Sequence, residues 1–254
     1  MLNFVEYGKE NKYDDDIFFQ KYSQMSRSQQ GLAGAGEWET LRKLLPDFKD
    51  KRVLDLGCGY GWHCIYAMEH GASSVVGVDI SHKMLEVAKE KTHFPQVEYK
   101  CCAIEDVEFP EESFDVILSS LAFHYVADYE ILVKKIYRIL KSGGKLVFTV
   151  EHPVFTAYGT QDWYYNEKGE ILHFPVDNYY YEGKRTAVFL GEKVTKFHRT
   201  LTTYLNTLLS NGFIINHIVE PQPPENMMDI PGMQDEMRRP MMLIVSANKN
   251  CYTT

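Results

Sequence analysis

The sequence has no apolar run long enough to cross a membrane, and it contains few cysteines. A membrane-spanning helix needs about 20 consecutive apolar residues, so an integral membrane protein is not expected. The five cysteines form no C-x-x-C pair, which argues against a disulfide framework and against a structural zinc site. The opening residues, MLNFVEYGKE, lack the charged and then apolar pattern of a signal peptide. We therefore expect a cytoplasmic protein that binds no membrane and no metal.

An excess of positive charge is also absent. The 254 residues include 27 Lys and Arg against 35 Asp and Glu, which gives a formal net charge of −8. Proteins that bind nucleic acids usually carry a basic surface, so we expect no nucleic-acid partner. No internal repeat is visible, and the length suits one α/β domain with insertions, as either a monomer or a homodimer.

Glycines alternate at positions 57, 59 and 61 in the string VLDLGCGYG. Glycine loses the most conformational freedom when it is ordered, so this alternation disfavours the interior of a helix or a strand. We therefore predict a strand over 53–56, a tight glycine loop and a helix that begins near Trp62. A second strand over 75–78 follows, and Asp79 stands at its end.

A strand, glycine loop, helix, strand and acid in this order can hold a nucleoside. A loop without Cβ atoms lets a ligand lie against the backbone, and the start of the helix offers unpaired N–H groups. Asp79 follows Gly59 by about 20 residues, which is the spacing of an acid that binds ribose hydroxyls.

The dinucleotide fingerprint G-x-G-x-x-G/A is incomplete, because Trp62 occupies its third small position. Asp55 stands two residues before the loop, where a carboxylate would repel a pyrophosphate but suit a cation such as a sulfonium. Both features favour a cationic nucleoside. An NAD-dependent oxidoreductase stays the alternative enzyme.

The strings VLDLGCGYG and VVGVDIS together resemble the cofactor site of class I S-adenosylmethionine-dependent methyltransferases, in particular their small-molecule (UbiE-like) branch. The resemblance covers about residues 20–250. It implies an α/β, Rossmann-like fold with a mostly parallel seven-stranded sheet, helices on both faces and a C-terminal antiparallel strand. It also implies S-adenosylmethionine as cofactor and a small molecule as methyl acceptor. A non-catalytic protein that binds S-adenosylmethionine is the second alternative.

The resemblance further implies which residues bind the cofactor. The glycine loop with its neighbours surrounds the methionine part, Asp79 binds the ribose, and Ile80 and Met84 flank the adenine, although Met84 suits the core equally well. Ile104 offers its backbone N–H to the adenine. The acid that usually binds the adenine amino group is replaced by Ala103, so Glu105 or a backbone carbonyl takes that role. Predicted cofactor contacts are Tyr22, Arg27, Asp55, Gly57, Gly59, Gly61, Trp62, Asp79, Ile80, Met84, Ile104, Glu105 and Ser119.

Tyr22 and Arg27 belong to an N-terminal segment that folds over the cofactor in similar methyltransferases. By this resemblance Arg27 meets the methionine carboxylate, and the equal alternative is a surface cation. Ser119 follows the strand predicted over 114–118, whose carboxyl end opens onto the transferred methyl group.

Four residues are expected to face the acceptor: His124, Tyr125, His152 and Trp163. Displacement at a sulfonium needs alignment and exclusion of water more than it needs a base. His124 and His152 are catalytic candidates because an imidazole titrates near neutrality, but a structural role is commoner, and no catalytic residue is assigned. The residues SSLA after the fourth strand lack the N/D-P-P-Y motif with which DNA-amino methyltransferases stack a flipped base, which argues against a DNA base as the acceptor.

The rest of the chain completes a single methyltransferase domain over residues 1–254. Residues 1–45 are expected to form a helical cap. Residues 152–196, rich in Tyr and Trp, are expected to form an insertion of one or two hairpins over the site. Its aromatic residues either line a pocket or form a small core or a dimer surface. Further helices are predicted over 38–45, 129–140 and 198–209, and further strands over 97–100, 146–150, 213–219 and 241–246.

Overall fold

A seven-stranded sheet forms the centre of the protein in the computed structural model, which describes residue 9 and residues 11–251. Its strands run in the order β10-β11-β5-β4-β1-β2-β3. β11 is antiparallel to both its neighbours, and the other pairs are parallel. This arrangement confirms the predicted fold class. The strands are β1 (Arg52–Leu56), β2 (Ser74–Asp79), β3 (Val97–Cys101), β4 (Phe114–Ser120), β5 (Leu140–Glu151), β10 (Phe213–Val219) and β11 (Met242–Lys249).

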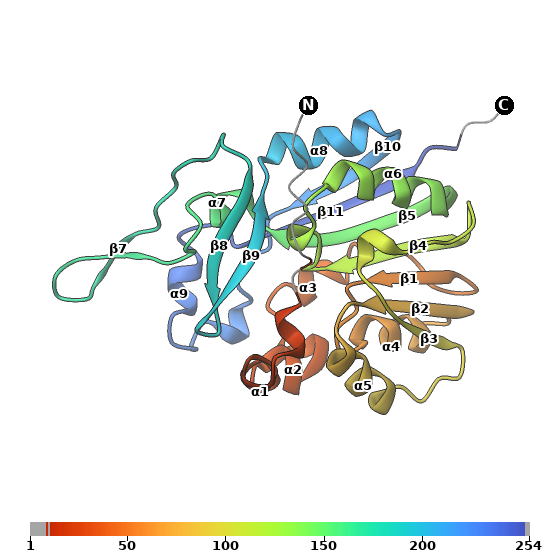
Figure 1. Ribbon diagram of the computed structural model, residues 1–254, viewed down its shortest axis with the longest axis horizontal. Coiled ribbons are helices and arrows are strands. Elements are labelled where there is room, and N and C mark those ends of the chain that lie inside the picture. The colour runs from red at the N-terminus through yellow and green to blue at the C-terminus, as the bar shows by residue number, and fades with distance from the viewer. Residues whose placement is uncertain (1–8, 10, 252–254) are drawn as a thin grey trace.

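Helices cover both faces of this sheet, because successive strand residues point to opposite faces and both sets are apolar. Leu54 and Val76 pack into the cluster that includes residues of α6 and α8, whereas Val53 and Val75 pack into the cluster with α3 and α4. The helices are α3 (Trp38–Leu41), α4 (Trp62–Glu69), α5 (His82–Lys91), α6 (Tyr129–Ile139) and α8 (Leu201–Ser210) (Figure 1). None of the helices in the described part of the chain combines the length and apolar character that spanning a membrane requires.

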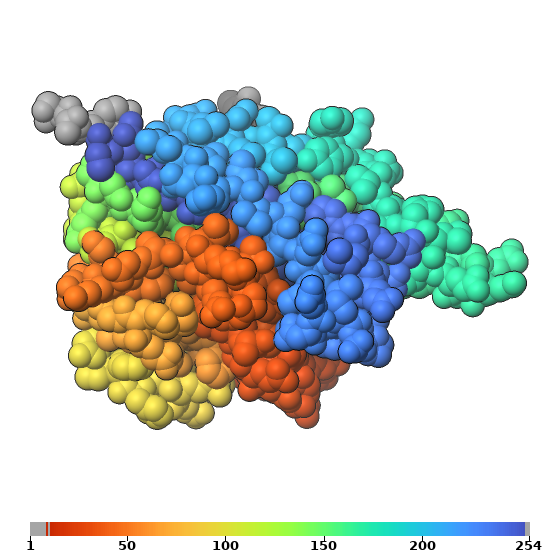
Figure 2. Space-filling view, turned by 180° about the vertical axis from the view of Figure 1, so that it is seen from behind, coloured from red at the N-terminus to blue at the C-terminus, as the bar shows by residue number. Residues whose placement is uncertain are grey.

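The N-terminal segment consists of short helices below the sheet in Figure 1. They are η1 (Lys12–Asp14), α1 (Asp16–Ser23), α2 (Ser26–Gln29) and η2 (Gly31–Gly34), followed by α3. Residues 1–8 and 10 of the predicted cap lie outside the described residues. Figure 2 shows this segment, in red and orange, beside the blue segment that contains η5 (Glu225–Met227) and α9 (Met233–Glu236).

Two antiparallel hairpins follow α7 (Pro153–Thr156). β6 (Tyr164–Tyr165) pairs with β7 (Ile171–His173), and β8 (Gly183–Phe189) pairs with β9 (Glu192–His198). The first hairpin projects from the body, whereas the second lies near α1 (Figures 1 and 2). Hairpins were predicted for this segment, but the sequence did not separate the projecting one from the packed one.

Several predicted boundaries are wrong. The strand predicted over 146–150 begins already at Leu140, and the strand predicted over 241–246 extends to Lys249. The helix predicted over 38–45 ends at Leu41, and α6 ends at Ile139 because Leu140 already belongs to β5. The helix predicted over 198–209 begins at Leu201, because His198 pairs with Gly183 in the second hairpin. The Thr200 side chain then accepts a hydrogen bond from the Thr203 N–H and caps α8.

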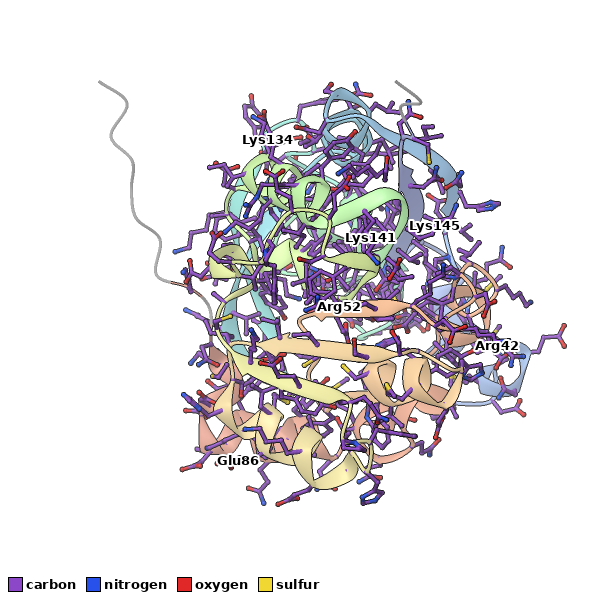
Figure 3. All side chains as sticks on the ribbon, turned by 90° about the vertical axis from the view of Figure 1, so that its right-hand side faces the viewer. Arg42, Arg52, Glu86, Lys134, Lys141 and Lys145 are labelled. Atoms are coloured by element: carbon purple, nitrogen blue, oxygen red, sulfur yellow. The ribbon has the colours of Figure 1, made fainter. Side chains whose placement is uncertain are left out.

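The two ends of the sheet differ in character. Figure 3 faces the end where β1 and β5 begin, and the labelled cations Arg52, Lys141 and Lys145 lie there. Asp115 accepts hydrogen bonds from the Arg52 N–H and the Lys141 ammonium at this end. Ligands of open α/β sheets bind at the opposite end, where the parallel strands stop.

The glycine loop gives a stability prediction with an internal control. Gly57 and Gly59 both have positive φ, 78° and 51°. A Cβ at Gly57 would lie 2.4 Å from the Ala122 Cβ, whereas a Cβ at Gly59 would meet nothing within 4 Å. Gly59→Ala should therefore cost only the left-handed backbone penalty of about 1–2 kcal/mol. Gly57→Ala should cost about 1–3 kcal/mol more through overpacking. Urea unfolding without ligand measures both, and equal losses would contradict this account.

Candidate active site

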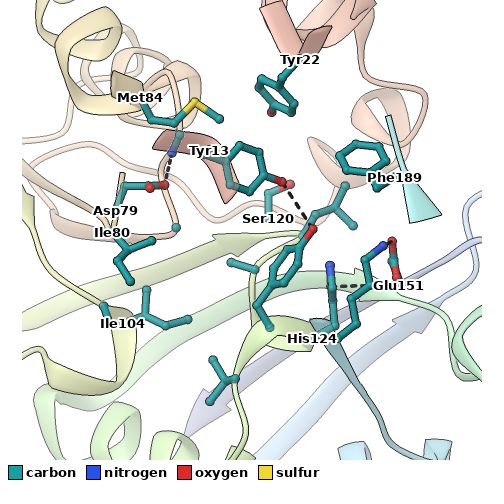
Figure 4. A pocket seen from close by; sticks show the side chains of 18 of the residues that line it. Tyr13, Tyr22, Asp79, Ile80, Met84, Ile104, Ser120, His124, Glu151 and Phe189 are labelled. Atoms are coloured by element: carbon teal, nitrogen blue, oxygen red, sulfur yellow. Dashed lines mark hydrogen bonds and ion pairs between the residues drawn. The ribbon is translucent and has the colours of Figure 1, made fainter. Parts of the chain in front are cut away.

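A cavity lies at the carboxyl ends of β1, β2, β4 and β5 (Figure 4). The N-terminal segment contributes Tyr13 and Met25 to its lining, and the second hairpin contributes Phe189 and Lys196. Predicted site residues that line it are Tyr22, Arg27, Gly57, Gly59, Asp79, Ile80, Met84, Ile104, Glu105, His124 and Tyr125. Segments far apart in the sequence therefore meet around a single cavity.

Asp79 is held rigidly at the end of β2. Its Oδ2 accepts a hydrogen bond from the Gly59 N–H at 2.9 Å, and its Oδ1 accepts one from the Ser81 N–H at 2.9 Å. Burial raises the pKa of this carboxyl, and the backbone hydrogen bonds act in the opposite direction. Each carboxylate oxygen can accept a second hydrogen bond, so Asp79 can bind two hydroxyls of a ligand.

Apolar side chains lie beside Asp79. Ile80, Met84 and Ile104 line the same part of the cavity (Figure 4). Ala103 and Glu105 line it as well, and burial raises the pKa of the Glu105 carboxyl. This is a surface on which a flat heterocycle can lie, with one carboxyl group at its edge.

A second, smaller cavity adjoins the glycine loop and contains an ion pair. Arg27 Nη2 lies 2.6 Å and 2.8 Å from the two carboxylate oxygens of Glu37, which is itself buried. Burial alone would lower the pKa of Arg27, but the charge of Glu37 raises it. The alternative of a surface cation at Arg27 is therefore wrong.

Two ring nitrogens in this second cavity are buried without a partner among the described residues: Trp62 Nε1 and His63 Nε2. Burial lowers the pKa of His63 to about 4, so its ring is neutral at pH 7. Unpaired buried polar atoms are rare in proteins and point to a missing partner such as a ligand. Together with Arg27 and Glu37 they form a polar chamber beside the loop.

The N-terminal segment is fastened over the main cavity by Asp14. This carboxylate accepts hydrogen bonds from Ser81 Oγ at 2.6 Å and from the Lys83 N–H at 3.2 Å, at the start of α5. The hydroxyl of Tyr13 lies 3.4 Å from that of Tyr125 (Figure 4). Asp14 is therefore a structural link between the N-terminal segment and α5. Tyr13 was missed because its sequence neighbours carry no motif.

The far end of the cavity holds a buried polar cluster that the sequence did not predict. Lys196 Nζ lies 2.5 Å from Glu151 Oε1 and 2.8 Å from Gln161 Oε1, and Gln161 Nε2 donates to Glu151 Oε2 at 2.6 Å. His124 Nδ1 accepts a 3.4 Å hydrogen bond from the Glu151 N–H. Burial lowers the pKa of His124 to about 4. Burial alone would raise the pKa of Glu151, but His124, Lys196 and Gln161 hold it below its usual value.

Two predictions chose the wrong member of a neighbouring pair. Ser119 is buried and donates to the Leu56 carbonyl at 2.7 Å, while Ser120 lines the cavity. His152 caps α7, with its Nε2 2.9 Å from Glu220 Oε1, while Glu151 lines the cavity. Adjacent strand residues point in opposite directions, so an error of one residue changes the face.

Four other predicted contacts do not line the main cavity. Asp55 is buried, receives a hydrogen bond from the Cys64 thiol of α4 at 3.4 Å, and has its pKa raised to about 7 by burial. Gly61 lets Tyr99 pack closely against the loop, because a Cβ at Gly61 would lie 2.2 Å from the Tyr99 hydroxyl. Trp163 packs against Phe174 in the insertion, with ring centroids 5.3 Å apart. Trp62 lines only the smaller cavity.

The charged residues of the site do not form a metal centre in the part of the chain that the structure describes. No group of three or more His, Cys, Asp or Glu side chains there is placed to hold a metal ion.

Residues 54–148 match the family described as "Methyltransferase domain". Part of the chain is 36% identical, over 112 residues, to a ubiquinone biosynthesis O-methyltransferase of Coxiella burnetii. This match spans 43% of the chain and 47% of that relative.

Two crystal structures are similar over most of the chain. A Listeria monocytogenes protein assigned to the S-adenosylmethionine-dependent methyltransferases is 58% identical, with a TM-score of 0.83, over 87% of this chain and 99% of that one. An S-adenosylmethionine-dependent methyltransferase of Mesorhizobium loti is 40% identical, with a TM-score of 0.80, over 86% and 100% of the two chains. With the glycine loop, Asp79 and the sheet order, these likenesses show that the chain belongs to the S-adenosylmethionine-dependent methyltransferases.

Proposed function

We propose that the protein transfers a methyl group from S-adenosylmethionine to a small-molecule acceptor held between Tyr125 and the Glu151 end of the cavity. The observation that carries this proposal is the continuity of the cavity. It runs from Asp79 and the glycine loop to His124, Glu151 and Lys196. A cofactor at the first end and an acceptor at the second would meet in its middle.

The residues present fit the cofactor. Asp79 offers two carboxylate oxygens, and Ile80, Met84 and Ile104 offer an apolar surface for a purine. Arg27 and Glu37 carry the charges complementary to the carboxylate and ammonium of an amino acid. The unpartnered Trp62 Nε1 and His63 Nε2 add polar groups beside them. We assign the methionine part to this smaller cavity, with Tyr22 and Gly57, which line both cavities, at the junction.

When bound, S-adenosylmethionine supplies a methyl group on a sulfonium, which reacts by in-line displacement. The task of the chain is then to align the acceptor and exclude water. Neither His124 nor Glu151 is suited to act as a base at neutral pH, because the pKa of each lies below its usual value. We therefore assign His124 and Glu151 to orienting the acceptor.

A small acceptor is favoured over a macromolecule because the site is covered. The described N-terminal segment brings Tyr13 against Tyr125, and the second hairpin adds Phe189 and Lys196 to the lining. The activity named for the ubiquinone biosynthesis relative supports a small acceptor too. A cytoplasmic location, the lack of a nucleic-acid partner and a monomeric or homodimeric state stay predictions.

The direct test uses a labelled methyl donor. Purified protein incubated with S-adenosylmethionine carrying a labelled methyl group and a small-molecule metabolite extract should transfer label to a compound of low mass. A parallel incubation offers RNA and protein as acceptors. Label found only in that incubation would overturn the small-molecule assignment. Binding of the donor without any transfer would indicate a non-catalytic protein.

Removal of the Asp79 carboxylate should weaken cofactor binding. Asp79→Ala should weaken the binding free energy of S-adenosylhomocysteine by about 1–3 kcal/mol and so raise its Kd, because charged hydrogen bonds are lost. Glu98→Ala on the neighbouring strand β3 is the control, since Glu98 lies outside both cavities. Titration calorimetry measures both, and an unchanged Kd in the Asp79 variant would exclude its assignment to the ribose.

The Arg27–Glu37 pair should act on the amino-acid part of the cofactor alone. Arg27→Met combined with Glu37→Gln removes both charges, so neither remains buried and unpaired. This double variant should bind S-adenosylhomocysteine at least about tenfold more weakly, through lost charged hydrogen bonds. It should keep its affinity for 5′-methylthioadenosine, which lacks the amino acid. Equal losses for both ligands, measured by calorimetry, would refute the assignment.

A further inference from the structure

The buried cluster at the far end of the cavity is a closed ring of three side chains. Lys196 donates to Glu151 and Gln161, and Gln161 donates to the second oxygen of Glu151. The Lys196 side chain is only 3% exposed, yet the residue lines the cavity. Glu151 lies at the end of β5, Gln161 lies in the insertion and Lys196 lies on β9. The ring is therefore assembled by the fold.

The ring leaves hydrogen-bonding capacity unused on both of its charged groups. An ammonium has three N–H donors, and the structure gives Lys196 two polar acceptors among the described residues. Each Glu151 oxygen accepts one side-chain hydrogen bond and can accept another. The ring thus keeps one cationic donor and spare carboxylate acceptors on side chains that are only 3% and 15% exposed. Leaving such a donor unsatisfied is costly.

The backbone of Gln161 supports a functional interpretation. Its φ is 62°, a conformation that is uncommon for a residue other than glycine. Strained residues of this kind persist where the surroundings hold them, and they gather at ligand sites. The two amide contacts of Gln161 fix both charged partners at once, which makes it a positioning residue.

The walls around the ring are apolar and largely aromatic. Phe155, Phe189, Met241 and Met242 line this part of the cavity with Tyr125. The Lys196 ammonium lies 5.4 Å from the ring centroid of Phe189 and 6.0 Å from that of Tyr125. An acceptor here has an apolar or aromatic body and presents a polar group to the ring.

We propose that Lys196 and Glu151, positioned by Gln161, recognise a hydroxyl group on an aromatic acceptor. This inference rests on the proposed function and specifies its substrate class. A hydroxyl both accepts from the spare Lys196 N–H and donates to Glu151. A carboxylate has no donor and is repelled by Glu151, and an ammonium has no acceptor and is repelled by Lys196. A site built to hydrogen-bond a hydroxyl discriminates strongly against analogues that lack it.

The test compares four probes of similar shape: phenol, benzylamine, which is an ammonium at neutral pH, benzoate and toluene. Their Kd values are measured by NMR titration on protein saturated with S-adenosylhomocysteine. Phenol should bind at least about tenfold more tightly than toluene, and benzylamine and benzoate should also bind more weakly than phenol. Lys196→Met combined with Glu151→Gln, which avoids an unpaired buried charge, should reduce the preference for phenol to less than about threefold. Lys193→Met, an exposed position on the same strand β9, should leave it unchanged.

Each outcome decides the matter, because S-adenosylhomocysteine binding by every variant is measured first. Equal binding of the four probes would overturn the inference, and so would a preference for phenol that survives in the double variant. No probe binding while S-adenosylhomocysteine binds would overturn the hydroxyl assignment and leave the proposed function intact. Failure of the wild-type protein to bind S-adenosylhomocysteine would defeat both. If the double variant does not fold, Gln161→Leu, which keeps both charges, should reduce the preference instead.

Discussion

The site depends on one carboxylate, that of Asp79, which joins the glycine loop to the start of α5. Asp79 accepts hydrogen bonds from the Gly59 N–H and the Ser81 N–H, so the end of β2 fixes both the loop and the entry to α5. Ser81 then caps α5 through the Met84 N–H and donates its hydroxyl to Asp14. A ligand bound at Asp79 therefore meets a surface that is already arranged, which lowers the entropy cost of binding.

The Asp14 contact extends this constraint to the cap. Because Asp14 is hydrogen-bonded to the start of α5, its neighbour Tyr13 lies over the cavity and contacts Tyr125. Tyr13, Tyr22 and Tyr125 form edge contacts around the middle of the cavity, where cofactor and acceptor would meet. Burial raises the pKa of Tyr13, so its hydroxyl stays neutral. The cap is thus part of the wall of the site, and its removal would open the cavity to water.

The two ends of the cavity differ in how they are built. The cofactor end uses short-range units in which a loop, a strand end and a helix start are close in sequence. The far end combines His124, Glu151, Gln161 and Lys196 from four separate segments, of which two belong to the insertion. Changes in the insertion can therefore alter the acceptor while the cofactor site stays the same, as expected when function is carried by loops on a common scaffold.

The location of the cofactor loop could be predicted from the sequence, because glycine spacing and a strand-ending acid are local features. The family resemblance that these motifs carry implied the fold class. The sequence placed Asp79, Ile80, Met84 and Ile104, all within or next to such units, at the cavity. It chose Ser119 over Ser120 and His152 over Glu151, because the face of a strand residue depends on register. No local pattern predicts that Lys196 and Gln161 meet Glu151 or that Asp14 meets Ser81. These contacts form only when the folded chain brings together residues 10, 45 and 67 positions apart.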